Sequence, residues 1–346
     1  MENKKTIFFN NGSSKEMQLL FPVKVLLENF SIKKTTKREN ADIIMGPIER
    51  FHHKDYLDNN KTNIIVSGEN IFFKRNLFSV LESILFRVVG NKKYKVLDFL
   101  DKIIPKIISG IPLSPFLKGY LKVLKKVKLG KLKNTYFILS NNLKEQNSSV
   151  LTMPLFMQYY EHLLKRLTNK RGKGIKEIKD KKFCAFVVSS NSSRERVHFF
   201  KELSKYKKVD SYGKVLNNCS DPKRKTLLDN PQIFKDYKFV ICFENSFTKG
   251  YITEKLPNVM FANSIPIYRG APNVGEYFNT KSFINYEDYE KSYDLMVQKI
   301  IELDKDPKKY KKIMEEPWFK ENKIPKTITG KKKELIKFYN LILNEK

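Results

Sequence analysis

The run KFVICFENSFTKGYITEKL at 238–256 contains the residues best suited to chemistry. Its apolar stretch 239–243 predicts a buried strand, and Glu244, Asn245 and Ser246 follow where that strand ends. Parallel α/β sheets carry their functional loops at the carboxyl ends of the strands. We therefore expect these three polar residues at the carboxyl edge of a sheet.

The second half of this run predicts an anion site. Gly250 allows a tight turn, Thr253 is the expected N-cap of a helix, and Glu254 and Lys255 fall in its first turn. A helix N-terminus favours phosphate through its free amides and its dipole. Lys255 adds positive charge, and Glu254 can accept hydrogen bonds from sugar hydroxyls. A plain strand, loop and helix with a capping carboxylate explains any one of these residues, but not the combination.

The elements that position this run alternate between strand and helix. In the second half of the chain, we expect strands at 182–190, 208–213, 238–246, 264–270 and 282–288, and helices at 196–206, 253–263, 290–303 and 307–316. In the first half, we expect strands at 5–9, 41–47, 63–70 and 135–142, a helix or strand about 15–30 and a helix at 155–167. This order predicts two doubly wound parallel sheets.

The expected domains are two facing Rossmann-like units with a cleft between them. They comprise residues 1–168 and 183–346, joined by a basic linker at 169–182, with a helical insertion at about 77–133 in the first unit. The 346 residues suit two domains of ordinary size. RGKG at 171–174 follows no strand, so it is not a dinucleotide fingerprint.

The charge is strongly basic: 67 Lys and Arg against 37 Asp and Glu give a net charge of +30. Such a charge is compatible with nucleic-acid binding. However, the lysines are spread along the chain among acids, and no nucleic-acid motif is readable. The stretch 118–133 differs, because it contains seven lysines and no acid. The overlapping segment 117–128 is expected to form an amphipathic helix that either lies on an anionic membrane or packs on the protein.

The cysteine pattern indicates a reducing compartment. Three cysteines are too few for a disulfide scaffold, and Cys184 and Cys242 lie in apolar runs where burial is expected. The N-terminus shows no secretory signal, and charges or prolines interrupt every long apolar run. We expect a cytoplasmic protein, with peripheral contact to the inner membrane face through 117–133 as an open alternative.

FENSFTKGYITEKL resembles the signature of the α1,3/α1,4-fucosyltransferases, glycosyltransferase family 10. SIPIYRG, KSFINYEDY and ELDKDPKKY follow in the family's order, and FVVSSNSSRERVHFFKEL and KVDSYGK precede it. The resemblance covers 182–320 and is weaker before it, where SGEN at 67–70 and MPL at 153–155 are similar. The insertion at 77–133 departs from the family pattern, and so does Pro257, in the first turns of the helix after TEKL.

This resemblance implies an inverting glycosyltransferase of GT-B architecture. The second domain would bind GDP-β-L-fucose, and the first would bind a GlcNAc-containing glycan that receives fucose at O3 or O4. Glu69 resembles the family's general base, and Arg196 and Lys255 match the two cations that stabilise the departing diphosphate. The remaining donor contacts implied by the resemblance are Ser190, Asn191, Tyr212, Asn245, Tyr251 and Glu254, with Tyr212 also suited to core packing.

We expect no required metal ion. Asp304-Lys305-Asp306 is the only Asp-x-Asp pattern and is read as a helix end, and the four histidines lack zinc-ligand spacing. Two rival functions stay open at this point: a GT-B enzyme that uses another nucleotide sugar, and a basic protein that binds nucleic acid or a membrane surface. Donor screening separates the first rival, and salt-dependent nucleic-acid binding would indicate the second.

Overall fold

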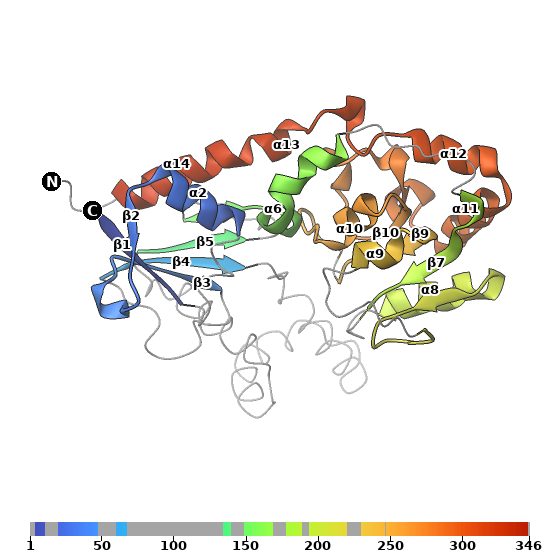
Figure 1. Ribbon diagram of the computed structural model, residues 1–346, viewed down its shortest axis with the longest axis horizontal. Coiled ribbons are helices and arrows are strands. Elements are labelled where there is room, and N and C mark those ends of the chain that lie inside the picture. Colours follow the sequence, from blue (N-terminus) through green and yellow to red (C-terminus); the bar gives the residue numbers. More distant parts are fainter. Residues whose placement is uncertain are drawn as a thin grey trace, which may run out of the picture.

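Two parallel β-sheets form the protein, side by side along its long axis (Figure 1). The structure is a computed structural model that describes residues 4–10, 20–47, 60–67, 134–139, 149–168, 178–188, 194–219, 230–245 and 247–344. Several sequence predictions lie outside these residues: Glu69, Ser190, Asn191, the insertion 77–133 with its segment 117–133, and most of the linker.

The first sheet has the strand order β2-β1-β3-β4-β5-β6, and all its strands are parallel. Its strands are β1 Lys5–Phe9, β2 Ile32–Lys34, β3 Ile43–Pro47, β4 Thr62–Ser67, β5 Thr135–Leu139 and β6 Val150–Thr152. Its helical segments are α2 Phe21–Asn29, η1 Arg38–Asn40, α6 Leu155–Tyr160 and η3 Glu161–Leu167. Central residues such as Ile43 and Ile64 are fully buried, as in parallel sheets covered on both faces.

The second sheet has the order β11-β10-β9-β7-β8 and is also parallel. Its strands are β7 Lys182–Phe186, β8 Val209–Ser211, β9 Tyr237–Ile241, β10 Ile265–Tyr268 and β11 Ile284–Asn285. The helices are α8 Arg194–Tyr206, α9 Asn230–Phe234, α10 Lys255–Phe261, α11 Tyr293–Lys305 and α12 Pro307–Glu315, with 3-10 turns η5 Val274–Glu276, η6 Thr280–Ser282, η7 Tyr286–Tyr289 and η8 Lys320–Asn322.

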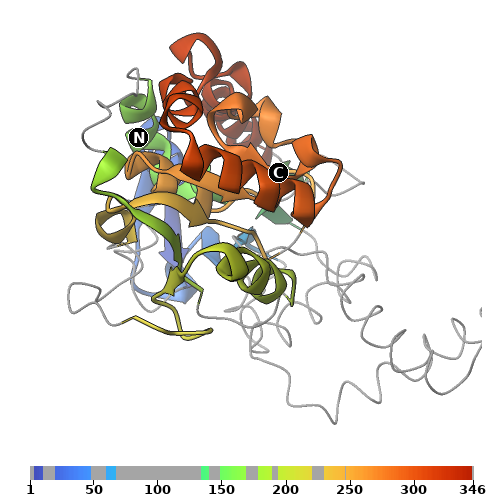
Figure 2. The same ribbon diagram turned by 90° about the vertical axis from the view of Figure 1, so that its right-hand side faces the viewer.

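Helices cover both faces of the second sheet (Figure 2). α8, α11 and α12 bury their apolar residues in one core cluster with Phe239 and Ile265. α9 and α10 belong to the other cluster, which continues into the first sheet. The two halves of the molecule therefore share one apolar core on this side.

The last two helices, α13 Lys326–Thr329 and α14 Lys331–Asn344, run from the second sheet back to the first (Figure 1). The Tyr339 hydroxyl donates to the Pro22 carbonyl oxygen over 2.9 Å, and Phe338 meets Tyr136 edge-on with ring centroids 6.3 Å apart. The domain division expected from the sequence keeps all residues after 183 together, whereas α14 packs beside α2 of the first sheet.

Most predicted elements are confirmed, with a few local corrections. β2 and β6 were not predicted, and the strand expected at 282–288 is reduced to the two residues of β11. The segment about 15–30 contains a helix, and the helix expected at 155–167 divides into α6 and η3. Within the described part of the chain, no helix is both long and apolar enough to span a membrane.

Candidate active site

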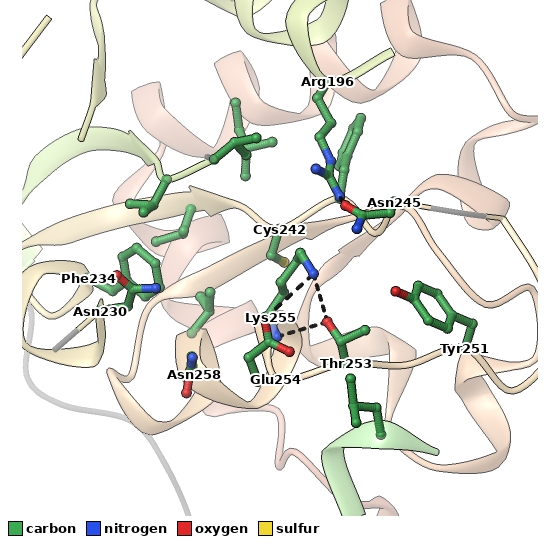
Figure 3. Close-up of a pocket in the computed structure, with 17 residues that line it drawn as sticks. Arg196, Asn230, Phe234, Cys242, Asn245, Tyr251, Thr253, Glu254, Lys255 and Asn258 are labelled. Carbon is green, nitrogen blue, oxygen red and sulfur yellow. Dashed lines mark hydrogen bonds and ion pairs between the residues drawn. The ribbon is translucent and has the colours of Figure 1, made fainter. Parts of the chain in front are cut away.

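A cavity of about 250 Å³ opens at the carboxyl edge of the second sheet, where β7 and β9 end (Figure 3). Arg196 from α8 and Lys255 from α10 line it together with residues of the loop after β9. Leu155, the first residue of α6, lines it from the side of the first sheet. The site therefore lies at the junction of the two halves, where strand ends converge as expected for parallel sheets.

The structure brings five of the predicted site residues together around this cavity. These residues are Arg196, Asn245, Tyr251, Glu254 and Lys255. They come from positions up to 59 residues apart in the sequence, from Arg196 to Lys255. Their convergence supports the chemistry expected from the sequence, which requires cations and sugar-binding groups on one surface.

Arg196 is a buried cation in the first turn of α8, and only 2% of it is exposed. Its guanidinium donates a hydrogen bond to the Asn245 side-chain oxygen, while its Nε has no hydrogen-bond partner among the described residues. Burial lowers the pKa of Arg196, although nearby Glu244 and Glu254 oppose this shift. A buried, incompletely paired guanidinium suits an anionic ligand with several acceptor oxygens.

Lys255 is the second cation, and it belongs to a tight cluster with Glu244 and Thr253. Its ammonium lies 3.2 Å from Glu244 Oε2. It also lies 2.9 Å from Thr253 Oγ1 and 3.6 Å from Glu254 Oε1 (Figure 3). Burial lowers the pKa of Lys255, but the carboxylates of Glu244 and Glu254 outweigh it and raise the pKa overall. Lys255 therefore stays charged at neutral pH.

The sequence analysis assigned no role to Glu244 and predicted only a helix-capping role for Thr253. Glu244 is fully buried, and burial raises its pKa although Lys255 opposes the shift. Glu254 occupies the N-cap position of α10, but its side chain makes no capping bond. Thr253 Oγ1 accepts from the Lys255 amide over 3.4 Å, as a cap would, and the Thr253 hydroxyl also bonds to Glu244. The signal for Glu244 is its place directly before Asn245, after an apolar strand.

The loop between β9 and α10 is held by its backbone. Gly250 adopts a φ of 81°, as its predicted turn requires, and its amide donates to the Asn273 side-chain oxygen over 2.8 Å. The Phe156 amide donates to the Ile252 carbonyl oxygen over 3.1 Å, which connects α6 to this loop. Pro257 is the third residue of α10, so its missing amide falls in the first turn and no helical hydrogen bond is lost.

The structure places Tyr212 elsewhere. Its hydroxyl lies 2.7 Å from that of Tyr237, which in turn donates to Asp210 over 2.7 Å. Tyr212 thus belongs to a hydrogen-bonded chain near β8 and does not line the cavity. The alternative role of Tyr212 in packing agrees with these contacts.

Asp304 and Asp306 have structural partners. Asp304 pairs with Lys207 and Lys238 at 3.1 and 2.8 Å, and Asp306 caps α12. Among the described residues, no group of three or more His, Cys, Asp and Glu is placed to bind a metal ion. Cys184 and Cys242 are buried, as expected from the apolar runs around them.

The two parallel sheets, with a cavity at the carboxyl edge of the second, are the arrangement of the GT-B fold. A crystal structure of an α1,3-fucosyltransferase with GDP has a TM-score of 0.63 to this chain, at 19% identity, and the match covers 100% of this chain and 92% of that one. A second crystal structure, of an α1,3-fucosyltransferase with GDP-fucose, gives 0.61 at 19% identity over 99% of this chain and 90% of that one. The expected GT-B fold is confirmed by this likeness.

The family follows from the second half of the chain. The model of glycosyltransferase family 10 (fucosyltransferase), C-terminal domain, matches residues 176–341. This match covers the second half of the chain, including FENSFTKGYITEKL. The family expected from FENSFTKGYITEKL is thereby confirmed.

Three relatives illustrate the breadth of this similarity. A putative fucosyltransferase R654 of Acanthamoeba polyphaga mimivirus is 33% identical over 195 residues, 53% of this chain and 31% of the relative. An α-(1,3)-fucosyltransferase FucT of Helicobacter pylori is 36% identical over 112 residues, 32% of this chain and 22% of the relative. A GDP-fucose protein O-fucosyltransferase 3 of Xenopus laevis is 34% identical over 190 residues, 47% of this chain and 37% of the relative. The chain spans well under half the length of these relatives.

Proposed function

We propose that the protein transfers L-fucose from GDP-β-L-fucose, with inversion, to a GlcNAc-containing glycan at O3 or O4. The observation that carries this proposal is the pair of cations, the buried Arg196 and the partly buried Lys255, at one cavity of the segment that matches the family-10 model. Both residues match the positions that the family signature assigns to the diphosphate. The relatives named as fucosyltransferases support GDP-fucose as the donor.

The cavity has two chemically different ends, which suit the two ends of a nucleoside diphosphate. Arg196 and Asn245 lie near one end, while Phe234, Asn230 and Asn258 lie toward the other (Figure 3). A diphosphate fits the cationic end, where guanidinium and ammonium can donate to its oxygens. An aromatic ring and two carboxamides suit a purine base, which needs a flat apolar contact and hydrogen-bonding partners.

The proposed reaction is a single displacement at the anomeric carbon of fucose. As the bond from fucose to the diphosphate breaks, negative charge grows on the leaving oxygen, and Arg196 and Lys255 stabilise it. The base must remove the acceptor hydroxyl proton from the opposite side, which assigns it to the first half of the chain. Glu69 is the proposed base on its position in SGEN after strand β4, and it lies outside the described residues.

Two classes of acceptor are candidates, a glycan and a protein side chain. The Helicobacter pylori relative is named an α-(1,3)-fucosyltransferase, whereas the Xenopus laevis relative is named a protein O-fucosyltransferase. The sequence resemblance favours GlcNAc in lactosamine-type or chitobiose-type glycans, and hence products of the Lewis type or fucosylated glycoproteins. A hydroxyl of a protein side chain is the second candidate acceptor.

One transfer assay tests both donor and acceptor. Purified protein is incubated with GDP-fucose, UDP-sugars or ADP-sugars and with lactosamine, lacto-N-biose, GlcNAc and Ser/Thr peptide acceptors, and product linkages are determined by NMR. We expect transfer from GDP-fucose to a GlcNAc-containing glycan, retained in EDTA because two protein cations face the diphosphate. Preferential turnover of a UDP- or ADP-sugar would refute the donor, and transfer to peptides alone would refute the glycan acceptor.

A further inference from the structure

Glu244 is a fully buried carboxylate whose partners all come from the segment that enters α10. It accepts from the Thr253 amide at 2.7 Å, from the Thr253 hydroxyl at 2.8 and 3.0 Å, and from the Lys255 ammonium at 3.2 Å. Its own amide donates to the Arg269 carbonyl oxygen of the β10 end over 2.7 Å. The Glu244 backbone is thus bonded to the end of β10, and its carboxylate is bonded to Thr253 and Lys255 at the start of α10.

Its location separates it from the residues that can touch a ligand. Thr253, Glu254 and Lys255 line the cavity, whereas Glu244 lies behind them. A Cβ atom built on Gly270 would lie 2.6 Å from Glu244 Cγ, so the side chain is packed tightly from the far side as well. Because Glu244 does not line the cavity and bonds to Thr253 and Lys255, which do, its effect on a ligand passes through these two residues.

The charges around the Lys255 ammonium explain why it needs such a partner. Glu244 faces it from the end of β9, Glu254 from its own helix start and Arg196 from α8. Burial and the Arg196 charge both favour loss of the Lys255 proton, and the two carboxylates oppose this. Glu254 is part of the cavity wall and is expected to bind the donor, so Glu244 is the partner that a bound ligand leaves in place.

We propose that Glu244 is a positioning residue that holds the Lys255 ammonium, charged and aimed at the diphosphate, without contacting the ligand. This inference rests on the proposed function, because it assumes that Lys255 binds the diphosphate of GDP. The same contact has a second consequence: Thr253 Oγ1 touches both side chains and completes a three-membered cluster whose geometry is set before the donor arrives.

Asp304 provides a matched control within the same domain. It is also a buried carboxylate with two lysine partners, Lys238 at 2.8 Å and Lys207 at 3.1 Å, and its side chain is 4% exposed. It joins α11 to β9 and to the end of α8 and does not line the cavity. Asp304→Asn therefore reports the cost of breaking a buried ion pair without touching Lys255.

The test is GDP affinity as a function of pH, measured by fluorescence titration for wild type, Glu244→Gln, Lys255→Met, the double variant and Asp304→Asn. Glu244 raises the pKa of Lys255, so its removal lowers that pKa, and GDP binding then weakens as the pH rises. Between pH 7 and pH 9, we expect the GDP affinity of Glu244→Gln to fall about tenfold more than the GDP affinity of the wild type. The double variant should show the pH dependence of Lys255→Met alone, and Asp304→Asn that of wild type.

Two results overturn this role while leaving the proposed function intact. One is a wild-type pH dependence of GDP affinity in Glu244→Gln. The other is a Glu244→Gln substitution that changes this pH dependence equally in the wild-type and Lys255→Met backgrounds. A wild-type protein that fails to bind GDP at either pH instead refutes the proposed function. If Glu244→Gln does not fold, Thr253→Val removes the hydroxyl that joins Glu244 to Lys255, and it should shift the pH dependence in the same direction by less; an unchanged profile overturns the role.

Discussion

Replacing Arg196 with methionine should strongly weaken donor binding while leaving the fold nearly as stable as before. Arg196 is 2% exposed, and burial lowers its pKa, which means that the charged side chain is disfavoured in the unliganded protein. Methionine fills a similar elongated space without charge. The variant gives up the bond to Asn245 but also removes the desolvated charge.

The expected magnitudes follow from these two opposing effects. Loss of a charge-assisted hydrogen bond costs about 1.5–3 kcal/mol, and removal of a buried charge offsets part of this, so the free energy of unfolding should change by about 1 kcal/mol or less. In the complex, a guanidinium that donates two hydrogen bonds to phosphate contributes about 3–6 kcal/mol by the same measure. We therefore expect kcat/KM to fall by roughly two to three orders of magnitude, the scale seen for one transition-state donor.

Calorimetric titration with GDP, urea unfolding and fucosyl transfer together check this prediction. Lys201→Met is the matched control, because Lys201 is an exposed residue of the same helix α8. The control should keep wild-type affinity and turnover. An Arg196→Met protein that binds GDP within about threefold of wild type would refute the diphosphate role, since about 1.4 kcal/mol corresponds to a tenfold change in affinity.

Three further predictions concern the base, the packing behind the site and a helix cap. Glu69→Gln should keep GDP-fucose binding while transfer falls by roughly 10²–10⁴, and Glu254→Gln should instead weaken donor binding; the reverse pattern in kinetics and calorimetry would exchange their roles. Gly270→Ala should lower the free energy of unfolding by about 1–3 kcal/mol, because its Cβ would clash with the Tyr268 hydroxyl and lie 2.6 Å from Glu244 Cγ, and an unchanged urea midpoint would contradict that packing. Asp306→Ala should cost about 1 kcal/mol in thermal unfolding while turnover stays at the wild-type level, since Asp306 only caps α12; lost turnover would contradict this.

The strands of both sheets were largely predictable because parallel strands are buried on both faces and appear as short apolar runs. Residues 41–47 and 238–246 are such runs, and both contain strands. β2 was not predictable on this basis, since Ile32–Lys34 has only one apolar residue and its pairing with β1 supplies the structure. The return of α14 to the first sheet also has no local signal, because its apolar face would suit either sheet.

The site was predictable where chemistry depends on position at a strand end, and not where it depends on a distant partner. Asn245 lies just after β9 and Lys255 opens the helix that follows, whereas Arg196 was assigned from its resemblance to the family signature. All three line one cavity. The role of Glu244 depends on how the chain returns after Gly250. That return places Thr253, nine residues further along the sequence, within hydrogen-bonding distance of Glu244. That return is set by tertiary contacts such as the Gly250 amide with Asn273, and no local pattern predicts it.

A crystal structure of the protein with GDP tests the central claim most directly. The account predicts the diphosphate between the Arg196 guanidinium and the Lys255 ammonium, with at least one phosphate oxygen within about 4 Å of each, and the nucleoside toward Phe234. GDP bound elsewhere on the protein, or in this cavity with its phosphates away from both cations, would contradict it.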